Sequence, residues 1–446
     1  MVIKRDIEEQ LLAWKNAPQR KPLLLQGARQ IGKTWVMEHF GKTHYRHCVK
    51  FDFDRMPELR DVFKITKQPE RLLKELSAYC EAPLLPEETL IIFDEIQECE
   101  EALNSLKYFC EEAPEYHIMA AGSLLGVAVR HRSMTVPVGK VRMMRMYPMT
   151  FREYLHASDE NTYNFADGLE KIDHLPAIIL NKLLLEYKRY QICGGMPEAV
   201  VAMLSDAGMA AVEETLHDIL DLYELDFAKY ADPVEIPRIR AVWHSLPAQL
   251  SKENRKFIYR VVREGARAKD YEDALLWLKD AGMIYQVQHL SKPGLPLSGY
   301  AESNIFKAYA CDCGLLRCMA RVGSDVIMNG NAGFTEFKGA LAENMVLQSL
   351  VAGQEMGLPY YWTSGNSAEV EFVVQYKDEV IPMEVKSEKN ISGRSLSVYN
   401  DKYSPRQRIR LSTRNLQQDG NLLCIPLPLA GWLPELLALD DRRPAL

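Results

Sequence analysis

The segment Gly27-Ala-Arg-Gln-Ile-Gly-Lys33-Thr34 decides how this chain folds. It follows the apolar run Pro22-Leu-Leu-Leu-Gln26 and precedes a helical pattern. Such a segment between a strand and a helix is typical of a phosphate-binding loop, because its glycines let backbone N–H groups approach phosphates and the helix presents its positive end. We therefore expect a nucleoside triphosphate to bind along the whole loop, formed by Gly27, Ala28, Arg29, Gln30, Ile31, Gly32, Lys33 and Thr34.

A second motif favours this interpretation over a chance glycine turn. Leu90-Ile-Ile-Phe93 predicts a buried strand, and two carboxylates follow it at Asp94 and Glu95. We expect Lys33 to reach the β and γ phosphates and Thr34 to bind magnesium. Asp94 would hold the magnesium shell through water, and Glu95 would polarise the attacking water as general base. The alternative is that both acids cap the next helix, since acidic residues favour helix N-termini.

A third strand-like run, His117-Ile-Met-Ala-Ala121, leads to Gly122 and Ser123. A polar group at such a strand tip can touch the γ-phosphate, so Ser123 is the candidate sensor, with a plain Gly-Ser turn as an equal alternative. A basic run follows, and it could supply an arginine finger within one chain or across subunits. Its members are Arg130, Arg132, Lys140, Arg142 and Arg145. We expect most of them to form a solvated charged face.

The chain is too long for one ordinary hydrophobic core, so we expect several domains in an α/β multidomain protein. Strand-like and helical patterns alternate over residues 1–155, which predicts a parallel sheet wrapped by helices. Residues 156–230 read as a helical lid or linker. Residues 231–320 have a winged-helix order, with helices expected over 236–250, 253–262 and 268–281 before a strand over 283–288. Residues 321–446 predict a second α/β module, with a helix over 341–351 and strands over 359–363, 370–375 and 380–385.

Composition narrows the class of protein. No stretch approaches the run of about 20 apolar residues that crosses a bilayer, and no secretory signal is visible, so we expect a cytoplasmic protein without membrane contact. Nine scattered cysteines favour reduced thiols, and Cys311, Cys313 and Cys318 lack the spacing of a zinc site. A net charge of −7 excludes a uniformly basic surface for nucleic acid, so any such surface must be local.

Five motifs occur in a fixed order along the chain and together resemble one family. Besides the loop at 27–34, they are Phe93-Asp-Glu-Ile-Gln97, Ala121-Gly-Ser123, Tyr147-Pro-Met-Thr-Phe151 and Gly194-Gly-Met-Pro197. The chain is similar to the prokaryotic AAA-type ATPases that carry a C-terminal domain of unknown function. The resemblance implies an AAA-like ATPase core that uses ATP and magnesium, a winged helix, and a C-terminal fold similar to restriction endonucleases. It implies no settled biological role.

Four residues of the C-terminal module fit the endonuclease-like fold. Glu343 lies on an expected helix, Glu371 within a strand, and Glu384 and Lys386 share one face at the end of the next strand. Such acids bind divalent ions, and the lysine stabilises the attacking hydroxide or the developing phosphorane charge. Glu371 departs from the usual aspartate, which changes the metal geometry. A retained fold with an ordinary Glu–Lys ion pair and no cleavage is the alternative.

Basic residues are concentrated in the winged-helix region and suggest DNA as a partner. They are Arg238, Arg240, Lys252, Arg255, Lys256, Arg260, Arg263, Arg267 and Lys269. An equal alternative is that they solvate helix faces or pair with acids of the ATPase, because a fold does not dictate its ligand. The sequence thus predicts an ATP-hydrolysing conformational switch with a DNA-binding or nuclease-like C-terminal half. The alternative is a signalling switch whose nucleotide state controls a protein partner, and self-association is compatible with both.

Overall fold

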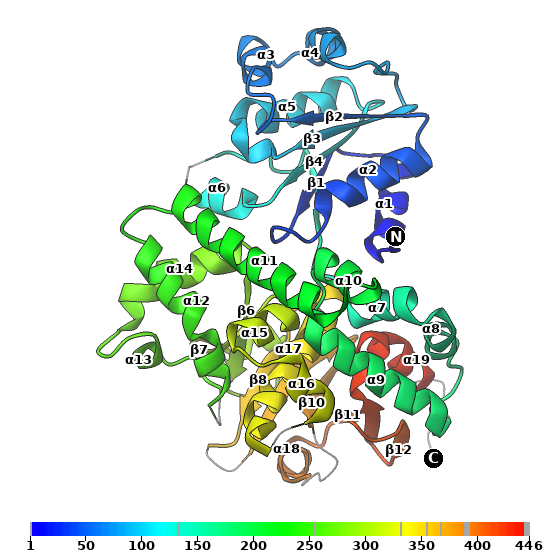
Figure 1. Cartoon of the computed structure of the whole chain (residues 1–446), viewed down its shortest axis with the longest axis vertical. Coiled ribbons are helices and arrows are strands. Elements are labelled where there is room, and N and C mark those ends of the chain that lie inside the picture. The colour runs from blue at the N-terminus through cyan, green and yellow to red at the C-terminus, as the bar shows by residue number, and fades with distance from the viewer. Residues whose placement is uncertain are drawn as a thin grey trace.

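The computed structural model describes residues 2–131, 134–252, 255–330, 332–353, 356–365, 368–387 and 393–440. An upper lobe holds the amino-terminal sheet, and a larger lower body holds the remainder of the chain (Figure 1). Helix α11 (Gly208–Tyr230) runs along the boundary between the two. No helix in the described part of the chain is both long enough and apolar enough to cross a membrane.

The upper lobe contains a five-stranded parallel sheet with the order β2-β3-β4-β1-β5. Its strands are β1 (Leu23–Gln26), β2 (His47–Asp52), β3 (Thr89–Asp94), β4 (His117–Gly122) and β5 (Arg142–Arg145). Its helices are α1 (Ile7–Lys15), α2 (Lys33–His44), α3 (Leu59–Ile65), α4 (Pro69–Leu76), α5 (Glu100–Glu112) and α6 (Leu125–His131). The predicted parallel sheet is confirmed.

Side chains alternate between the two faces of this sheet, as the strand period requires. In β3, Leu90 and Ile92 pack into one core, whereas Ile91 and Phe93 pack into the other. Both faces are therefore buried, which explains the near-continuous apolar runs of the central strands. At the edge, β5 buries only Met144. The sequence suggested a basic run here and not a strand, because an exposed edge strand needs no apolar alternation.

The next segment is helical, as predicted. It comprises α7 (Phe151–Ser158), α8 (Glu160–Asp167), α9 (Ala177–Cys193), α10 (Pro197–Leu204) and α11. Helix α7 begins with a capping box, in which Thr150 Oγ1 accepts from the Glu153 amide and the Glu153 carboxylate accepts from the Thr150 amide. Because reciprocal capping satisfies two otherwise unpaired amides, it defines where this helix starts.

The winged-helix order is present, with one helix shorter than expected. Its elements are α12 (Ile236–Leu250), α13 (Tyr259–Val262), α14 (Ala268–Asp280), β6 (Ile284–Leu290) and β7 (Ala301–Ala310). The prediction of a helix from Glu253 is wrong for residues 255–258, while Glu253 itself lies outside the described residues. Ile258 is extended because both its N–H and its C=O bond the side chain of Gln249, and the amide of Phe257 donates to Phe306.

The C-terminal part is the second α/β module that the sequence predicts. Its elements are α15 (Cys313–Met319), α16 (Ser324–Asn329), α17 (Thr335–Gly353), β8 (Tyr360–Thr363), β9 (Glu369–Tyr376), β10 (Glu379–Val385), α18 (Arg394–Tyr403), β11 (Arg408–Ser412), β12 (Gln417–Asp419), β13 (Leu422–Pro426) and α19 (Leu433–Asp440). An eight-stranded sheet has the order β12-β13-β11-β10-β9-β8-β6-β7. Strand β6 pairs with β8 in parallel. The winged-helix ribbon and the C-terminal strands therefore belong to one sheet, although the sequence predicts a division between residues 320 and 321.

Candidate nucleotide-binding site

The loop between β1 and α2 has a backbone that requires glycine at both ends. Gly27 has φ 151° and Gly32 has φ 86°. A Cβ atom on Gly27 would lie 2.3 Å from the carbonyl oxygen of Met146, so no side chain fits there. Gln30 is also left-handed, at φ 64°. Left-handed residues within such a loop turn successive N–H groups into one concavity, which is a binding site for anions.

Lys33, the first residue of α2, is directed back into the loop. Its Nζ donates to the carbonyl oxygens of Gly27, at 3.0 Å, and of Ala28, at 2.7 Å. The side chain is buried, and burial lowers the pKa of Lys33 to about 8, although the charges of Glu95 and Asp94 oppose this shift. A buried ammonium beside an anion-binding concavity is placed to receive phosphate oxygens.

Thr34 and Asp94 are brought together at the ends of neighbouring elements. Thr34 Oγ1 donates to Asp94 Oδ2 at 2.9 Å and lies 3.2 Å from Oδ1. Asp94 ends β3 and is buried, and burial raises the pKa of its carboxyl group against the bond from Thr34. Hydroxyl and carboxylate oxygens are the ligands that Mg²⁺ prefers, and magnesium keeps several waters of its own. The two side chains therefore fit a magnesium ion.

Glu95 is held by two side chains. It adopts a left-handed backbone at φ 48°, Gln97 Nε2 donates to its Oε2 at 2.5 Å, and Ser123 Oγ donates to its Oε1 at 3.2 Å. Ser123 thus stands beside Glu95 at the tip of β4. Gln97 is a functional candidate that the sequence did not indicate by itself, although it ends the motif Phe93-Asp-Glu-Ile-Gln97.

Helix α11 reaches the loop through Arg29. The guanidinium of Arg29 forms an ion pair with the buried carboxylate of Asp226, and Tyr223 donates from its hydroxyl to the Arg29 carbonyl at 2.9 Å. Farther along α11, the hydroxyl of Tyr230 donates to Glu98, just beyond Glu95. The helix therefore contacts both the phosphate-binding loop and the segment that follows β3. Nothing in the local sequence signals a contact between residues 29 and 226.

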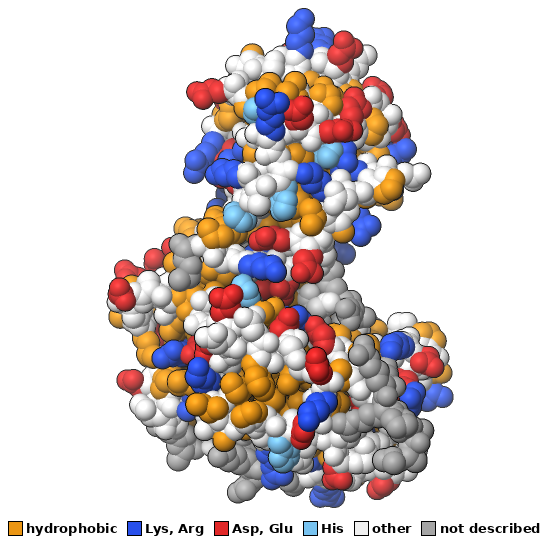
Figure 2. Space-filling view, turned by 90° about the vertical axis from the view of Figure 1, so that its right-hand side faces the viewer, with side chains coloured by type: hydrophobic (Ala, Val, Ile, Leu, Met, Phe, Trp, Pro, Cys, Tyr) orange, Lys and Arg blue, Asp and Glu red, His pale blue; other side chains and the backbone are white. Residues whose placement is uncertain are grey.

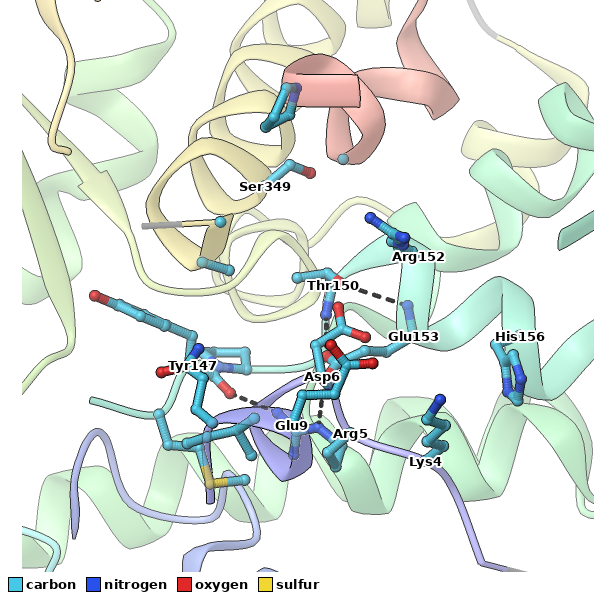
Figure 3. A pocket seen from close by; sticks show the side chains of 18 of the residues that line it. Lys4, Arg5, Asp6, Glu9, Tyr147, Thr150, Arg152, Glu153, His156 and Ser349 are labelled. Atoms are coloured by element: carbon cyan, nitrogen blue, oxygen red, sulfur yellow. Dashed lines mark hydrogen bonds and ion pairs between the residues drawn. The ribbon is translucent and has the colours of Figure 1, made fainter. Parts of the chain in front are cut away.

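Arg5 fastens the amino-terminal segment to the same loop (Figure 3). Its Nη1 donates to the carbonyl of Ile31 at 3.0 Å, its Nη2 donates to Tyr147, and its Nε pairs with Glu153 at 2.9 Å. Arg5, Tyr147 and Glu153 also line a cavity of about 420 Å³. Arg5 is buried, so this linkage is part of the interior. It ties the loop to α7.

The basic run separates into paired and site-facing residues. Arg130 pairs with Asp280 at 2.8 Å, and Lys140 pairs with Glu111 at 2.6 Å. Arg142 is an exposed residue of β5, and Arg132 lies outside the described residues. Arg145, at the end of β5, lines a cavity of about 260 Å³ that Gly27, Ala28 and Ser123 also line. Of the described members of the run, Arg145 is the one placed beside the loop.

The four C-terminal candidates converge as the sequence analysis expects, but each acid has a basic partner. Lys386 Nζ lies 3.3 Å from Glu371 Oε1 and 3.7 Å from Glu384 Oε1. Glu384 also accepts from Arg410 at 2.8 Å, and Glu343 pairs with Arg255. All three acids are buried. Burial raises the pKa of Glu371 to about 7, while the charge of Lys386 opposes the shift.

Some basic residues of the winged-helix region form ion pairs, and others are exposed. Arg238 pairs with Glu235 and Arg240 with Glu224, both at 2.6 Å, but these acids lie in α11 and just before α12 and not in residues 1–155, so these two pairs are not the expected pairs with acids of the ATPase. The side chains of five others are exposed, around α13 and the start of α14: Lys252, Arg260, Arg263, Arg267 and Lys269. The face in Figure 2 carries Lys and Arg interspersed with Asp and Glu.

The cysteine cluster does not form a metal site of its own. All nine cysteines are free thiols, and Cys311 and Cys313 are buried. Cys318 Sγ lies 3.5 Å from Nδ1 of His217, with Glu213 also nearby. Glu213, however, is held by Arg317 through both Nη atoms, at 2.8 and 3.0 Å. An acid already engaged by a buried arginine is a poor ligand.

Comparisons with known proteins agree with this geometry. Residues 19–155 match the family described as an AAA domain, and residues 184–326 and 338–430 match two families, each described as a domain of unknown function. No curated protein matches the chain at a significant level.

The search of solved structures gives matches with low identities and low TM-scores. One is a Walker-type ATPase of Pyrococcus abyssi, with 17% identity, coverage of 72% of this chain and 96% of that chain, and a TM-score of 0.41. Another is the Aeropyrum pernix ORC2 protein in its ADP form, with 14% identity, 74% and 94% coverage, and a TM-score of 0.30. A third is the ORC1 protein of the same organism in complex with DNA, with 13% identity, 72% and 93% coverage, and a TM-score of 0.27. Residues 19–155 thus match AAA domains and have a P-loop fold, and they are joined in one chain to two regions that match domains of unknown function.

Proposed function

We propose that this chain binds ATP with Mg²⁺ at residues 27–34 and hydrolyses it slowly, so that the nucleotide state sets the position of α11. The observation that carries the proposal is the 2.9 Å bond from Thr34 to Asp94, beside the buried ammonium of Lys33. It supplies the hydroxyl, carboxylate and cation that phosphoryl transfer from a P-loop uses. We name ATP and not GTP because of the family resemblance alone.

Each side chain then has a defined task. Lys33 exchanges the carbonyls of Gly27 and Ala28 for β- and γ-phosphate oxygens. Thr34 would hold the magnesium ion directly and Asp94 through water, and the ion would neutralise charge that develops on the phosphates. Glu95 accepts the proton of the attacking water, with its carboxylate oriented by Gln97 and Ser123.

Arg145 is our candidate for an arginine finger in the same chain. It lines the cavity that Gly27 and Ala28 of the loop also line. A guanidinium beside the transferring phosphoryl group stabilises charge in the transition state. A finger from a second subunit would replace this role if the protein self-associates.

The ion pair between Arg29 and Asp226 supports the switching part of the proposal. A triphosphate in the loop attracts Arg29 and repels Asp226, because both lie at the loop. Weakening this pair releases α11, which continues into the winged helix. Nucleotide binding would thereby reach the lower body of the molecule.

Two classes of partner fit this switch. DNA fits the exposed basic residues around α13, which would contact phosphates without reading sequence. The alternative is a protein partner whose binding depends on nucleotide state, with the C-terminal module acting only in docking. Turnover of ATP that DNA stimulates would favour the first class, and absence of DNA binding at low salt would favour the second.

A second candidate function is metal-dependent cleavage of nucleic acid in the C-terminal module. The observation that favours it is the convergence of Glu371, Glu384 and Lys386 within 3.7 Å. Incubating DNA with Mn²⁺ or Mg²⁺, with and without ATP, tests it. Cleavage that disappears in Lys386→Ala would support it, and intact DNA beside undiminished ATP turnover would leave an ATPase with an inactive nuclease fold.

ATP turnover by wild type, Lys33→Ala and Glu95→Gln tests the principal proposal. We expect Glu95→Gln to keep nucleotide binding and to lower kcat about 100-fold or more, because it removes the general base. Lys33→Ala should lose both binding and turnover. Undiminished turnover by Glu95→Gln would contradict the assigned chemistry.

A further inference from the structure

Arg255 is inserted among the C-terminal acids from the winged-helix region. Its guanidinium forms an ion pair with Glu343, a side chain of α17 that is 1% exposed. Tyr309 of β7 donates to the other oxygen of the same carboxylate at 2.9 Å. Arg255 itself is 15% exposed, so it is an interior group and not a surface charge.

Two features of the surroundings favour this placement. Arg255 has a left-handed backbone at φ 47°, which costs free energy for a side chain with a Cβ and persists only when the surroundings enforce it. Gly339 lies one turn before Glu343 on α17, and a Cβ there would approach the Arg255 Nη2 atom to 2.8 Å. A residue other than glycine would thus crowd the guanidinium.

The charges around these acids cancel when all three carboxylates are ionised. Three buried carboxylates, at Glu343, Glu371 and Glu384, face three cations. The cations are Arg255, Lys386 and Arg410. A further buried cation, Lys307, also acts on Glu371, but its charge is matched by its ion pair with Glu369. The charge of Arg255 acts on Glu371 as well as on Glu343. A divalent ion added to this balanced set would have to displace a cation, because like charges in a buried site repel strongly.

We propose that Arg255 is a built-in counter-cation that closes a latent divalent-metal site formed by Glu343, Glu371 and Glu384. Lys386 directly follows β10, which carries Glu384, and so stays with the acids, whereas Arg255 belongs to the winged-helix region and can withdraw. Withdrawal of Arg255 leaves an excess of one negative charge among the three acids. The metal site is therefore available only when the Arg255 side chain moves away from Glu343 of α17.

The proposed metal site uses the same carboxylates as the second candidate function. Only its biological purpose rests on that function. Failure to cleave DNA would leave it standing, because it concerns metal binding. Terbium, an oxygen-seeking stand-in for a divalent ion, provides the probe. Its emission is sensitised by a nearby tyrosine, and Tyr309 bonds Glu343 directly.

The experiment is a terbium titration of the full chain without nucleotide. Wild type is compared with Arg255→Gln, with the double variant Arg255→Gln/Glu343→Gln, and with the matched control Arg260→Gln, an exposed arginine of α13. We expect Arg255→Gln to bind terbium at a concentration at least about tenfold lower than wild type, from the removal of one buried like charge. The control should match wild type, and the double variant should lose the gain.

Equal terbium binding by wild type and a folded Arg255→Gln would overturn the proposal, and so would a gain that survives in the double variant. Limited trypsin digestion keeps the test decisive if Arg255→Gln fails to fold. Glu343→Gln removes the partner of Arg255, so cleavage after Arg255 should become at least about tenfold faster than in wild type, because the arginine is no longer held inside. Unchanged cleavage after Arg255 would contradict the proposal that Glu343 holds this arginine inside.

Discussion

Lys33 is a buried residue whose protonation should change when a nucleotide binds beside it. Burial holds its pKa at about 8 in the free loop, and bound phosphates would raise that pKa. Near pH 8.5 the free protein therefore carries a partly neutral Lys33, and ATP binding should take up a proton. Affinity should fall as the pH rises above about 8, because more of the free lysine is then neutral.

Calorimetric titration with ATP at pH 8.5, in two buffers of different ionisation enthalpy, measures this uptake. A fraction of a proton bound per ATP is expected, and it should be absent in Lys33→Ala if that variant is driven to bind at high ATP concentration. Identical heats in the two buffers would mean that Lys33 is fully charged before ATP arrives.

Contiguous motifs made the positions of the candidate site residues predictable. Contacts between residues far apart in the sequence were not predictable. The loop 27–34, the acids at 94 and 95 and Ser123 each follow a strand, so their positions follow from the order of the strands. The pairing of Arg29 with Asp226 joins positions 197 residues apart. A charge within a long helix does not reveal its tertiary partner, so that contact required the structure.

At the scale of elements, α11 is the part that should respond to nucleotide. Asp226→Asn keeps the size of the side chain and removes its charge from the edge of the loop. We expect ATP to bind about fivefold more tightly, which corresponds to roughly 1 kcal/mol from the loss of a nearby like charge. Calorimetric titration measures the change, with Asp221→Asn, on an exposed position of the same helix, as the control. Weaker binding by Asp226→Asn would show that the ion pair builds the site instead of restraining it.

Strand β4 carries a buried histidine that links stability to pH. His117 lies 2.6 Å from the Tyr45 hydroxyl through Nδ1, and among the described residues its buried Nε2 has no partner. Burial, helped by Arg20 and Lys15, lowers the pKa of His117 from 6.5 to about 3. The neutral ring is therefore favoured in the folded state, and this stability is complete above pH 6.5 and is lost as the pH falls toward 3.

Urea denaturation at pH 7 and pH 5 tests this linkage. Wild type should lose about 2 kcal/mol of unfolding free energy between these pH values from His117 alone. His117→Gln should lack that part of the loss, whatever its stability at pH 7. An equal loss in both proteins would mean that the histidine titrates normally.

The elements that the sequence misjudged share a physical cause. Residues 142–145 lack alternating apolar positions because only one face of β5 meets the core. Residues 255–258 have a helical composition, but contacts with Gln249 and Phe306 hold them extended. In both places tertiary contacts override local propensity.

At the scale of the whole molecule, the shared sheet is what the sequence concealed most. The pairing of β6 with β8 joins Leu290 to Trp362 across some seventy residues, so a movement of the winged-helix ribbon is a movement of the C-terminal sheet. Long-range strand pairing leaves no local signature, whereas the order of helices and strands within each part does. The fold class was therefore predictable, and the way its parts join was not.

DNA binding is also expected to depend on the surface of the whole molecule. Replacing Arg260, Arg263 and Lys269 together with glutamine should weaken binding to DNA of any sequence and reduce the slope of log affinity against log salt by about 0.9 for each lost phosphate contact. Fluorescence anisotropy across a salt series measures the slope. Arg240→Gln is the control, since Glu224 already holds that guanidinium. An unchanged slope in the triple variant would direct attention to the protein-partner alternative.

The central claim is that residues 27–34 hold ATP with magnesium, and equilibrium binding of ATP to wild type, Lys33→Ala and Lys42→Ala tests it most directly. Lys42 lies on the same helix as Lys33 but is exposed, so it controls for the loss of a lysine. We predict that wild type and Lys42→Ala bind ATP equally in the presence of Mg²⁺, and that Lys33→Ala binds at least about 100-fold more weakly, as expected when a buried charge-assisted contact is lost. Binding by Lys33→Ala as tight as that of wild type would contradict the assignment of this loop as the nucleotide site.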